Sequence, residues 1–151
     1  MPNAKCYLGV DLGGTNIKAA LVTADGEILK EASAPTNLPR TAESEYSNNL
    51  DWRDYPLRAR LAGHLGLNAA MGNDANVAAL GEALAGCGRN AESTIVVTLG
   101  TGVGAGVVLG GKLLTGYTGA ASEAGHMVIL DTPDAPRCTC GRPGCFESLA
   151  S

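Results

Sequence analysis

Apolar stretches separated by tight polar turns make up the first thirty or so residues of the chain. Two apolar stretches, 6–12 and 17–22, are separated by a Gly-Gly-Thr-Asn turn, and Asp25-Gly26 follows the second stretch. An Asp-Gly pair between apolar stretches is typical of a hairpin, so a third strand should follow it. The pattern therefore predicts three antiparallel strands joined by tight turns. The polar stretch 32–51 contains two prolines and is predicted to be a loop.

The middle of the chain changes to helical spacing. Leu57, Leu61 and Leu65 are four residues apart, so they fall on one face of a helix. Gly66 can end that helix. Residues 74–85 repeat the helical spacing of apolar side chains and form the clearest predicted helix.

The order strand, glycine turn, strand, hairpin, strand occurs again in the second half of the chain. Its apolar stretches are 94–99, 105–109 and 112–114, separated by the glycine-rich turn 100–104 and by Gly110-Gly111. A repeated unit predicts two related lobes. Two unrelated β-meanders would give the same pattern, so the pattern alone leaves both interpretations open.

Composition places the chain among globular proteins, because 45% of its residues are hydrophobic and 17% are charged. The net charge of −4 and the absence of a basic cluster argue against a nucleic-acid partner. No apolar stretch reaches the roughly 20 residues that span a bilayer, and no signal-peptide pattern is visible. We therefore expect a cytoplasmic protein with no membrane partner. Cysteines are reduced in that compartment, so clustered cysteines indicate metal ligands.

Both glycine turns have the chemistry of an anion site. Glycines let backbone N–H groups approach an anion, and a threonine hydroxyl adds a donor. The turn Gly13-Gly14-Thr15 leads into a strand and not a helix, which excludes a Rossmann or Walker site. Asp11, at the preceding strand end, could hold Mg²⁺ through water. Two such turns could hold one polyphosphate between them, although each turn alone is equally typical of a surface hairpin.

Four residues near the end of the chain have the composition of a zinc site. Cys138, Cys140 and Cys145 lie within eight residues of each other and follow His126. Three thiolates and one imidazole match a tetrahedral structural Zn²⁺ site. The alternative is a set of unconnected reduced thiols.

By contrast, the Asn73-Asp74 pair that opens the predicted helix is most often a simple helix cap.

Taken in order, these segments resemble the ROK family (repressors, open reading frames, kinases). The resemblance implies an α/β protein with the actin-like ATPase (ribonuclease H-like) fold and two incomplete lobes. Residues 1–72 would be the remnant of the N-terminal lobe with the first phosphate loop. Residues 73–151 would be a partial C-terminal lobe with the second phosphate loop and the zinc site. The matching segments are residues 11–15, 73–76, 81–82, 99–104, 123–126 and 138–147.

The resemblance also implies roles for individual residues. Asp74 would be the general base that takes the proton from a sugar hydroxyl. The sugar's other hydroxyls would be bound by Asn73, Glu123, His126 and Glu147. The phosphates of ATP and the bridging Mg²⁺ would be held by Asp11, Gly13, Gly14, Thr15, Lys18, Gly100, Thr101, Gly102 and Gly104. Zinc would be held by His126, Cys138, Cys140 and Cys145.

The chain also departs from the family pattern. Between Thr41 and Asn48 the family normally has a helix, a strand and a sugar-contacting loop, and here that block is absent. The chain also stops at Ser151, soon after the cysteines. We therefore expect phosphorylation of a hexose, most simply glucose, with little or no activity in this shortened chain.

Two alternatives stay open beside the kinase. One is a non-catalytic, zinc-stabilised remnant that binds sugar. The other is a sugar-responsive transcriptional regulator of the same family without its DNA-binding part, although few residues precede the first strand here. Family members commonly form dimers or tetramers, so a homo-oligomer is a candidate assembly. The identity of the hexose is not fixed by these residues.

Overall fold

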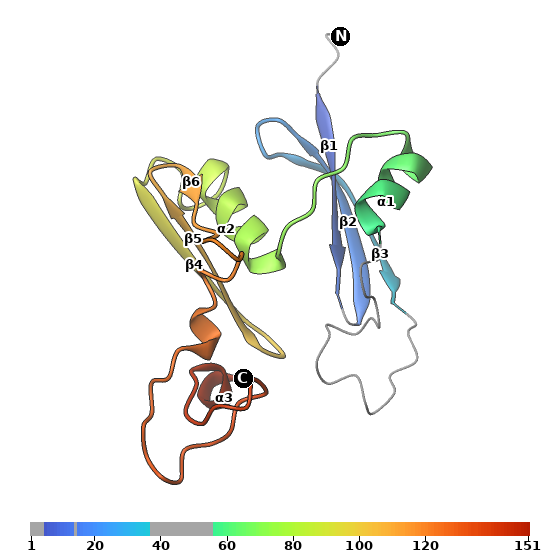
Figure 1. Cartoon of the computed structure of the whole chain (residues 1–151). Coiled ribbons are helices and arrows are strands. Elements are labelled where there is room, and N and C mark those ends of the chain that lie inside the picture. Colours follow the sequence, from blue (N-terminus) through green and yellow to red (C-terminus); the bar gives the residue numbers. More distant parts are fainter. Residues whose placement is uncertain (1–4, 14, 37–55) are drawn as a thin grey trace. The chain divides into compact units, whose positions relative to one another are not determined.

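The computed structural model describes residues 5–13, 15–36 and 56–151 (Figure 1). The chain divides into two compact units, Met1–Met71 and Gly72–Ser151. Each unit has its own three-stranded sheet. Both sheets are entirely antiparallel, because each strand follows its neighbour through a turn.

The first unit is a β-meander followed by a helix. Its strands β1 (Cys6–Leu12), β2 (Asn16–Thr23) and β3 (Ile28–Pro35) lie in the order β1-β2-β3, as the apolar stretches and turn residues predicted. Leu12 pairs with Ile17 and so closes the first glycine turn. Helix α1 (Leu57–Leu65) ends at Gly66, whose φ of 64° is the left-handed conformation that glycine favours at a helix end.

One boundary of the first unit differs from the prediction. Residues 32–35 were expected to be loop, but β3 continues through them to Pro35. They pair with β2 in register, with Ala32 opposite Ala19 and Ala34 opposite Ile17. The prediction was wrong because it relied on local polarity and on proline. The edge of β2 supplies backbone partners for residues 32–35, and these partners keep the segment in the sheet.

The second unit begins with one helix packed on a sheet. Helix α2 (Asp74–Leu84) contacts β4 (Ser93–Leu99) and β5 (Val103–Leu109), and β6 (Lys112–Leu113) completes the order β4-β5-β6. These elements confirm the predicted helix and the second meander. Gly110 and Gly111 have φ values of 53° and 73°, the conformation of a tight hairpin turn between β5 and β6.

Small side chains let α2 approach the sheet closely. Ala75 and Ala79 are 3% and 0% exposed, and they face glycines of β5. A Cβ atom added to Gly106 would overlap the backbone oxygen of Ala75 and the methyl group of Ala79. The close approach fixes the first turn of α2 beside Gly104, where an added Cβ would lie 3.1 Å from the Cβ of Ala75.

The end of the chain has little regular structure. The short 3-10 helix η1 (Ala124–His126) and helix α3 (Glu147–Ala150) are its only helical turns among the described residues. Two isolated β-bridges, Val128 with Cys145 and Arg137 with Pro143, hold the intervening loop. This segment carries all three clustered cysteines.

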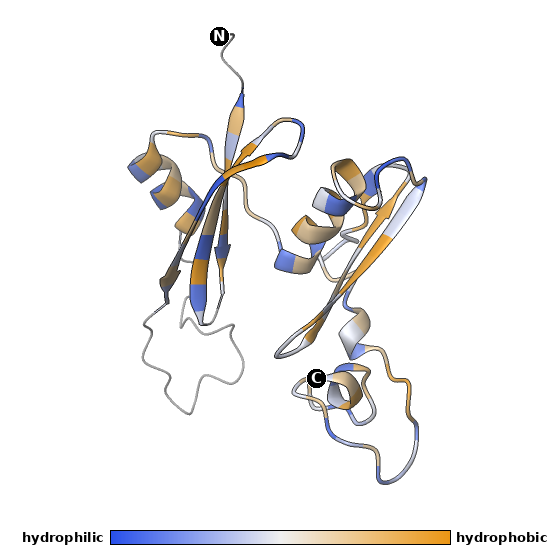
Figure 2. Ribbon diagram, turned by 180° about the vertical axis from the view of Figure 1, so that it is seen from behind, coloured by the Kyte–Doolittle hydropathy of each residue, from blue (hydrophilic) through white to orange (hydrophobic). Residues whose placement is uncertain are grey.

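Large apolar side chains remain exposed in both units. Ile95 and Leu99 of β4 are 68% and 66% exposed, and β1 and β3 are exposed along their whole length. Figure 2 shows apolar residues along these strands, interspersed with polar ones. Apolar faces of this kind are typical of surfaces that other parts of a protein cover. Among the described residues no helix has both the length and the apolar composition needed to cross a membrane.

Candidate metal centre and adjoining glycine loop

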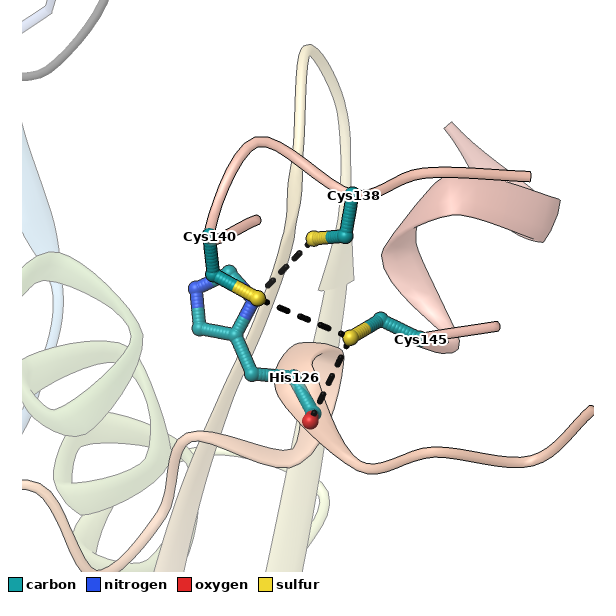
Figure 3. A group of neighbouring side chains, drawn as sticks. All are labelled: His126, Cys138, Cys140 and Cys145. Atoms are coloured by element: carbon teal, nitrogen blue, oxygen red, sulfur yellow. Dashed lines mark hydrogen bonds between the residues drawn. The ribbon is translucent and has the colours of Figure 1, made fainter. Parts of the chain in front are cut away.

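The structure brings the four predicted metal ligands together. Ligand atoms of His126, Cys138, Cys140 and Cys145 all lie within 4.8 Å of one another (Figure 3). The Sγ atom of Cys138 is 3.5 Å from Nδ1 of His126. The Sγ atoms of Cys140 and Cys145 are 3.7 Å apart.

Two of these separations match those around a zinc ion. Zn–S and Zn–N bonds of about 2.3 Å and 2.05 Å in a tetrahedron require about 3.8 Å between two sulfurs and about 3.6 Å between sulfur and nitrogen. Cys140–Cys145 and Cys138–His126 match these two values closely. The donor set of three thiols and one imidazole is the soft set that zinc prefers. Nδ1 is the nitrogen of His126 that faces Cys138, which leaves Nε2 for another partner.

Two glycines shape the backbone around the cluster. Gly141 has a φ of 88°, and its N–H donates to the carbonyl of Cys138 at 2.9 Å, closing a turn between ligands. Gly144 has a φ of 70°, and its carbonyl accepts from the N–H of Ile129 at 2.9 Å. A Cβ atom added to Gly144 would overlap the carbonyl oxygen of Leu130. Glycine is therefore required directly before Cys145.

The cysteines differ in electrostatic environment. Hydrogen bonds from the backbone and side chain of Arg142 lower the pKa of Cys140 to about 6. Burial, reinforced by the neighbouring cysteines, raises the pKa of Cys145 to about 11. Arg142 also donates from Nη2 to the carbonyl oxygen of His126 at 3.1 Å. A zinc ion with three thiolates has a net charge of −1, which the guanidinium of Arg142 would offset.

Three parts of the second unit meet at the end of the second glycine loop, where β5 begins. The head of α2 reaches it through Ala75, which lies against Gly104. The 3-10 helix η1 reaches it through Gly125, which lies against the carbonyl of Val103 so closely that a Cβ would overlap it. Glu147 reaches it from the cysteine segment, since Oε2 accepts the N–H of Val103 at 3.0 Å.

Glu147 connects this loop to the cysteine cluster. Its Oε1 atom accepts from the hydroxyl of Thr139 at 3.0 Å, and Sγ of Cys138 lies 3.6 Å away. Burial opposes ionisation of Glu147. Hydrogen bonds from Val103 and Thr139 and the nearby His126 outweigh it and hold the pKa below its ordinary value. The carboxylate is therefore charged at neutral pH.

The residues at the head of α2 act as helix caps. Oδ1 of Asn73 accepts from the N–H of Asn76 at 3.1 Å, and Oδ1 of Asp74 accepts from the N–H of Ala75 at 2.8 Å. Asp74 is exposed, and so is Glu123, which precedes η1. The cap interpretation is thus correct for Asn73, and it leaves the Asp74 side chain accessible at the loop end of α2.

The first glycine loop lies in the other unit. Its turn is closed by the N–H of Gly13, which donates to the carbonyl of Asn16 at 3.1 Å. Asp11 lies opposite Lys18 in the register of β1 and β2. Gly14, predicted to be part of this loop, lies outside the described residues. Four predicted residues, Asp11, Gly13, Thr15 and Lys18, therefore lie in one unit and the other site residues in the second.

Sequence patterns missed three residues that build these sites. Thr36 holds the first glycine loop, since its hydroxyl donates to the carbonyl of Gly13 at 2.7 Å and its N–H to that of Thr15 at 3.0 Å. The other two are Thr139 and Arg142, beside the metal ligands. The position of Thr36 could have been found by extending the third strand along β2. Nothing in local spacing would have shown the contacts of Thr139.

The fold defines the class of protein. The structure superimposes on the crystal structure of a glucokinase from Streptomyces griseus in complex with glucose and AMPPNP. The TM-score is 0.79, at 33% sequence identity, over 97% of this chain and 57% of that one. The chain therefore carries the actin-like ATPase fold of such sugar kinases. It belongs to the ROK family, whose family model matches residues 45–151.

Relatives within the family differ in activity. A glucokinase of Thermotoga maritima is 37% identical over 188 aligned residues, which take in the whole of this chain and 58% of that enzyme. A xylose repressor of Bacillus subtilis is 35% identical over 106 residues, 70% of this chain and 27% of the repressor. The chain thus spans a little over half of the glucokinases. The Thermotoga alignment is longer than the 151 residues of this chain, which confirms the predicted internal shortening.

Proposed function

We propose that this chain derives from an ATP-dependent hexose kinase, with glucose as the substrate. The proposal is supported by its similarity to glucokinases and by one feature of the second unit. The first turn of α2, which carries Asp74, lies against Gly104 and Gly106 of β5, directly after the second glycine loop. A carboxylate beside an anion-binding loop is the pairing that phosphoryl transfer requires.

Each part of the second unit has a role in this proposal. Asp74 accepts the proton of the attacking sugar hydroxyl, and its exposed position leaves it open to a substrate. The sugar is oriented by Asn73, Glu123, His126 and Glu147. Nε2 of the histidine faces the sugar, and Nδ1 faces the metal ligands. Fixing one imidazole nitrogen in this way sets the direction of the other. A zinc ion bound by the cluster supplies that orientation.

Phosphate binding is assigned to the two glycine loops. Gly100, Thr101, Gly102 and Gly104 offer backbone donors in the second unit, and Gly13, Gly14 and Thr15 offer them in the first. Asp11 and Lys18 complete the first loop, the aspartate toward Mg²⁺ and the lysine toward phosphate. Phosphoryl transfer needs mainly positioning and charge stabilisation, which these groups can provide. Because the chain is shortened, we expect turnover well below that of a full-length relative.

A coupled ADP-release assay with Mg-ATP and a panel of hexoses tests the proposal. We expect glucose to support turnover, and Asp74→Asn to reduce it by at least about 100-fold, the usual contribution of a general base. Glucose binding, measured by titration calorimetry, should survive the substitution. Asp134→Asn, an exposed aspartate in the same unit, is the matched control and should leave both readouts unchanged.

The outcomes separate the alternatives. Turnover that survives Asp74→Asn would show that another group is the base. Glucose binding without turnover in the unsubstituted chain would favour the zinc-stabilised sugar-binding remnant. The similarity to a xylose repressor favours the regulator as second candidate. Binding of xylose in preference to glucose, with no ADP release, would support that function instead.

A further inference from the structure

Glu147 lies between two sites that the proposed function treats separately. One carboxylate oxygen accepts the N–H of Val103 at 3.0 Å, where the second glycine loop joins β5. The other accepts the hydroxyl of Thr139 at 3.0 Å, in the metal segment. Val103 and Glu147 are 44 residues apart in sequence, so this bond is the product of the tertiary fold.

The loop end of this connection is tightly packed. Val103 is 5% exposed, and Gly125 lies against its carbonyl group. A Cβ atom added to Gly102 would lie 2.6 Å from Oε2 of Glu147. The carboxylate therefore occupies the space that any side chain at residue 102 would need. The N–H of Val103, the first residue of β5, is directed at this carboxylate.

The metal end depends on the cysteines. Thr139 stands between two of the ligands, Cys138 and Cys140, and Sγ of Cys138 is 3.6 Å from Oε1 of Glu147. A metal-bound cysteine is a thiolate and no longer donates a hydrogen bond. The Thr139 hydroxyl is then the donor that remains for Oε1. Fixing Cys138 and Cys140 on an ion would fix Thr139 between them.

We propose that Glu147 is a positioning residue that couples the metal cluster to the second glycine loop. Occupation of the cluster fixes Thr139, Thr139 orients the carboxylate, and the carboxylate holds the N–H of Val103 in place. This coupling goes beyond sugar phosphorylation and does not rest on it. It concerns the conformation of the loop, which can be measured without nucleotide, sugar or turnover.

Amide hydrogen exchange of the 151-residue chain, resolved by NMR, tests the coupling. With zinc bound we expect slow exchange at Val103, and removal of zinc by a chelator should accelerate it at least tenfold. The N–H of Gly110 donates to the carbonyl of Glu92 at the other end of the sheet. It serves as the internal reference, and its exchange should change less than twofold.

Three substitutions distinguish a loss of this coupling from a general loss of structure in the second unit. Glu147→Ala should give fast exchange at Val103 with or without zinc. Glu147→Gln should restore most of the protection, because its amide oxygen can accept from Val103 while its NH₂ group donates to Thr139. Glu92→Ala removes an exposed acidic side chain of the same unit and should leave Val103 unchanged.

Gly102→Ala provides an independent variant. The added methyl group would displace the carboxylate, which ends a flexible side chain and can swing away, while all metal ligands and Glu147 itself are retained. We expect the same fast exchange at Val103 as in Glu147→Ala. This variant decides the matter if the alanine variant at 147 does not fold.

Two results would overturn the proposal. One is slow exchange at Val103 in zinc-loaded Glu147→Ala or Gly102→Ala. The other is equal acceleration by the chelator in the unsubstituted chain and in folded Glu147→Ala, which would mean that metal acts on the loop by another route. Because coupling is reciprocal, zinc affinity measured by competition should fall in Glu147→Ala by the factor by which zinc protects Val103.

Discussion

Cys145 is the most constrained residue of the candidate metal centre. Its side chain is fully buried, its Sγ atom is 3.7 Å from that of Cys140, and Gly144 fixes the backbone before it. Burial also raises its pKa to about 11, so without a metal it stays a neutral thiol at physiological pH. A side chain with this environment gains its thiolate form from a bound cation.

Cys145→Ser should therefore abolish stable zinc binding. We expect zinc affinity, measured by competition with a chromogenic chelator, to fall by more than about 100-fold, beyond the loss typical for groups that merely orient a ligand. Cys87→Ser is the matched control, since Cys87 is exposed and lies outside the cluster. Equal zinc affinity in the two variants would contradict the assignment of Cys145 as a ligand.

At the scale of elements, the contact between α2 and β5 positions the head of the helix. The contact depends on glycine and alanine, because Gly106 leaves no room for a Cβ atom between Ala75 and Ala79. By contrast, Gly81 lies in α2 itself, and the space where its Cβ would be is open. The two glycines therefore predict opposite responses to the same substitution.

Gly106→Ala should destabilise the second unit by about 1–3 kcal/mol, the usual cost of an overpacked core. Gly81→Ala should stabilise it by about 0.5–1 kcal/mol, because alanine has the higher helix propensity. Urea unfolding followed by far-UV circular dichroism measures both free energies. If both variants shifted the same way, α2 would not approach β5 as closely as the structure shows.

At the scale of the whole molecule, the two compact units should respond differently to metal removal. Residues 127–151 contain one short helix and two isolated bridges, so the metal cluster is their main cross-link. Structural zinc sites contribute of order 10 kcal/mol to the folding of such segments. The sheet of the first unit contains none of the four cluster ligands.

Chelation should therefore make the chain susceptible to trypsin at one place. We expect cleavage after Arg137 to accelerate at least tenfold when zinc is removed. Cleavage after Arg58, in α1 of the first unit, should stay constant. Mass spectrometry of the early fragments measures both rates. Uniform acceleration at the two sites would show instead that the metal stabilises the entire chain.

Local patterns predicted most of this fold. The two meanders, α1 with its end at Gly66 and α2 all follow from periodicity and turn residues, which act over a few positions. The extension of β3 to Pro35 did not follow, because strand pairing depends on a neighbour and not on the polarity of the strand itself.

The site was predictable where composition is distinctive. Three cysteines and a histidine gather in the structure as their spacing suggested. The hydrogen bond from Val103 to Glu147 could not be predicted, because it joins residues 44 positions apart. Its donor is a backbone N–H, a group that does not depend on the side chain at that position. Arg142 was missed for a similar reason: its effect on Cys140 arises from the conformation of the turn between ligands.

The cysteine cluster is buried on one side and partly exposed on the other. Cys138 and Cys145 are 6% and 0% exposed, whereas Cys140 and His126 are partly open to solvent. An approaching chelator or competing ion would meet Cys140 and His126 first, so exchange should proceed from that side. A bulky chelator should therefore remove the metal more slowly than a small chelator of equal affinity, because both must approach it past Cys140 and His126.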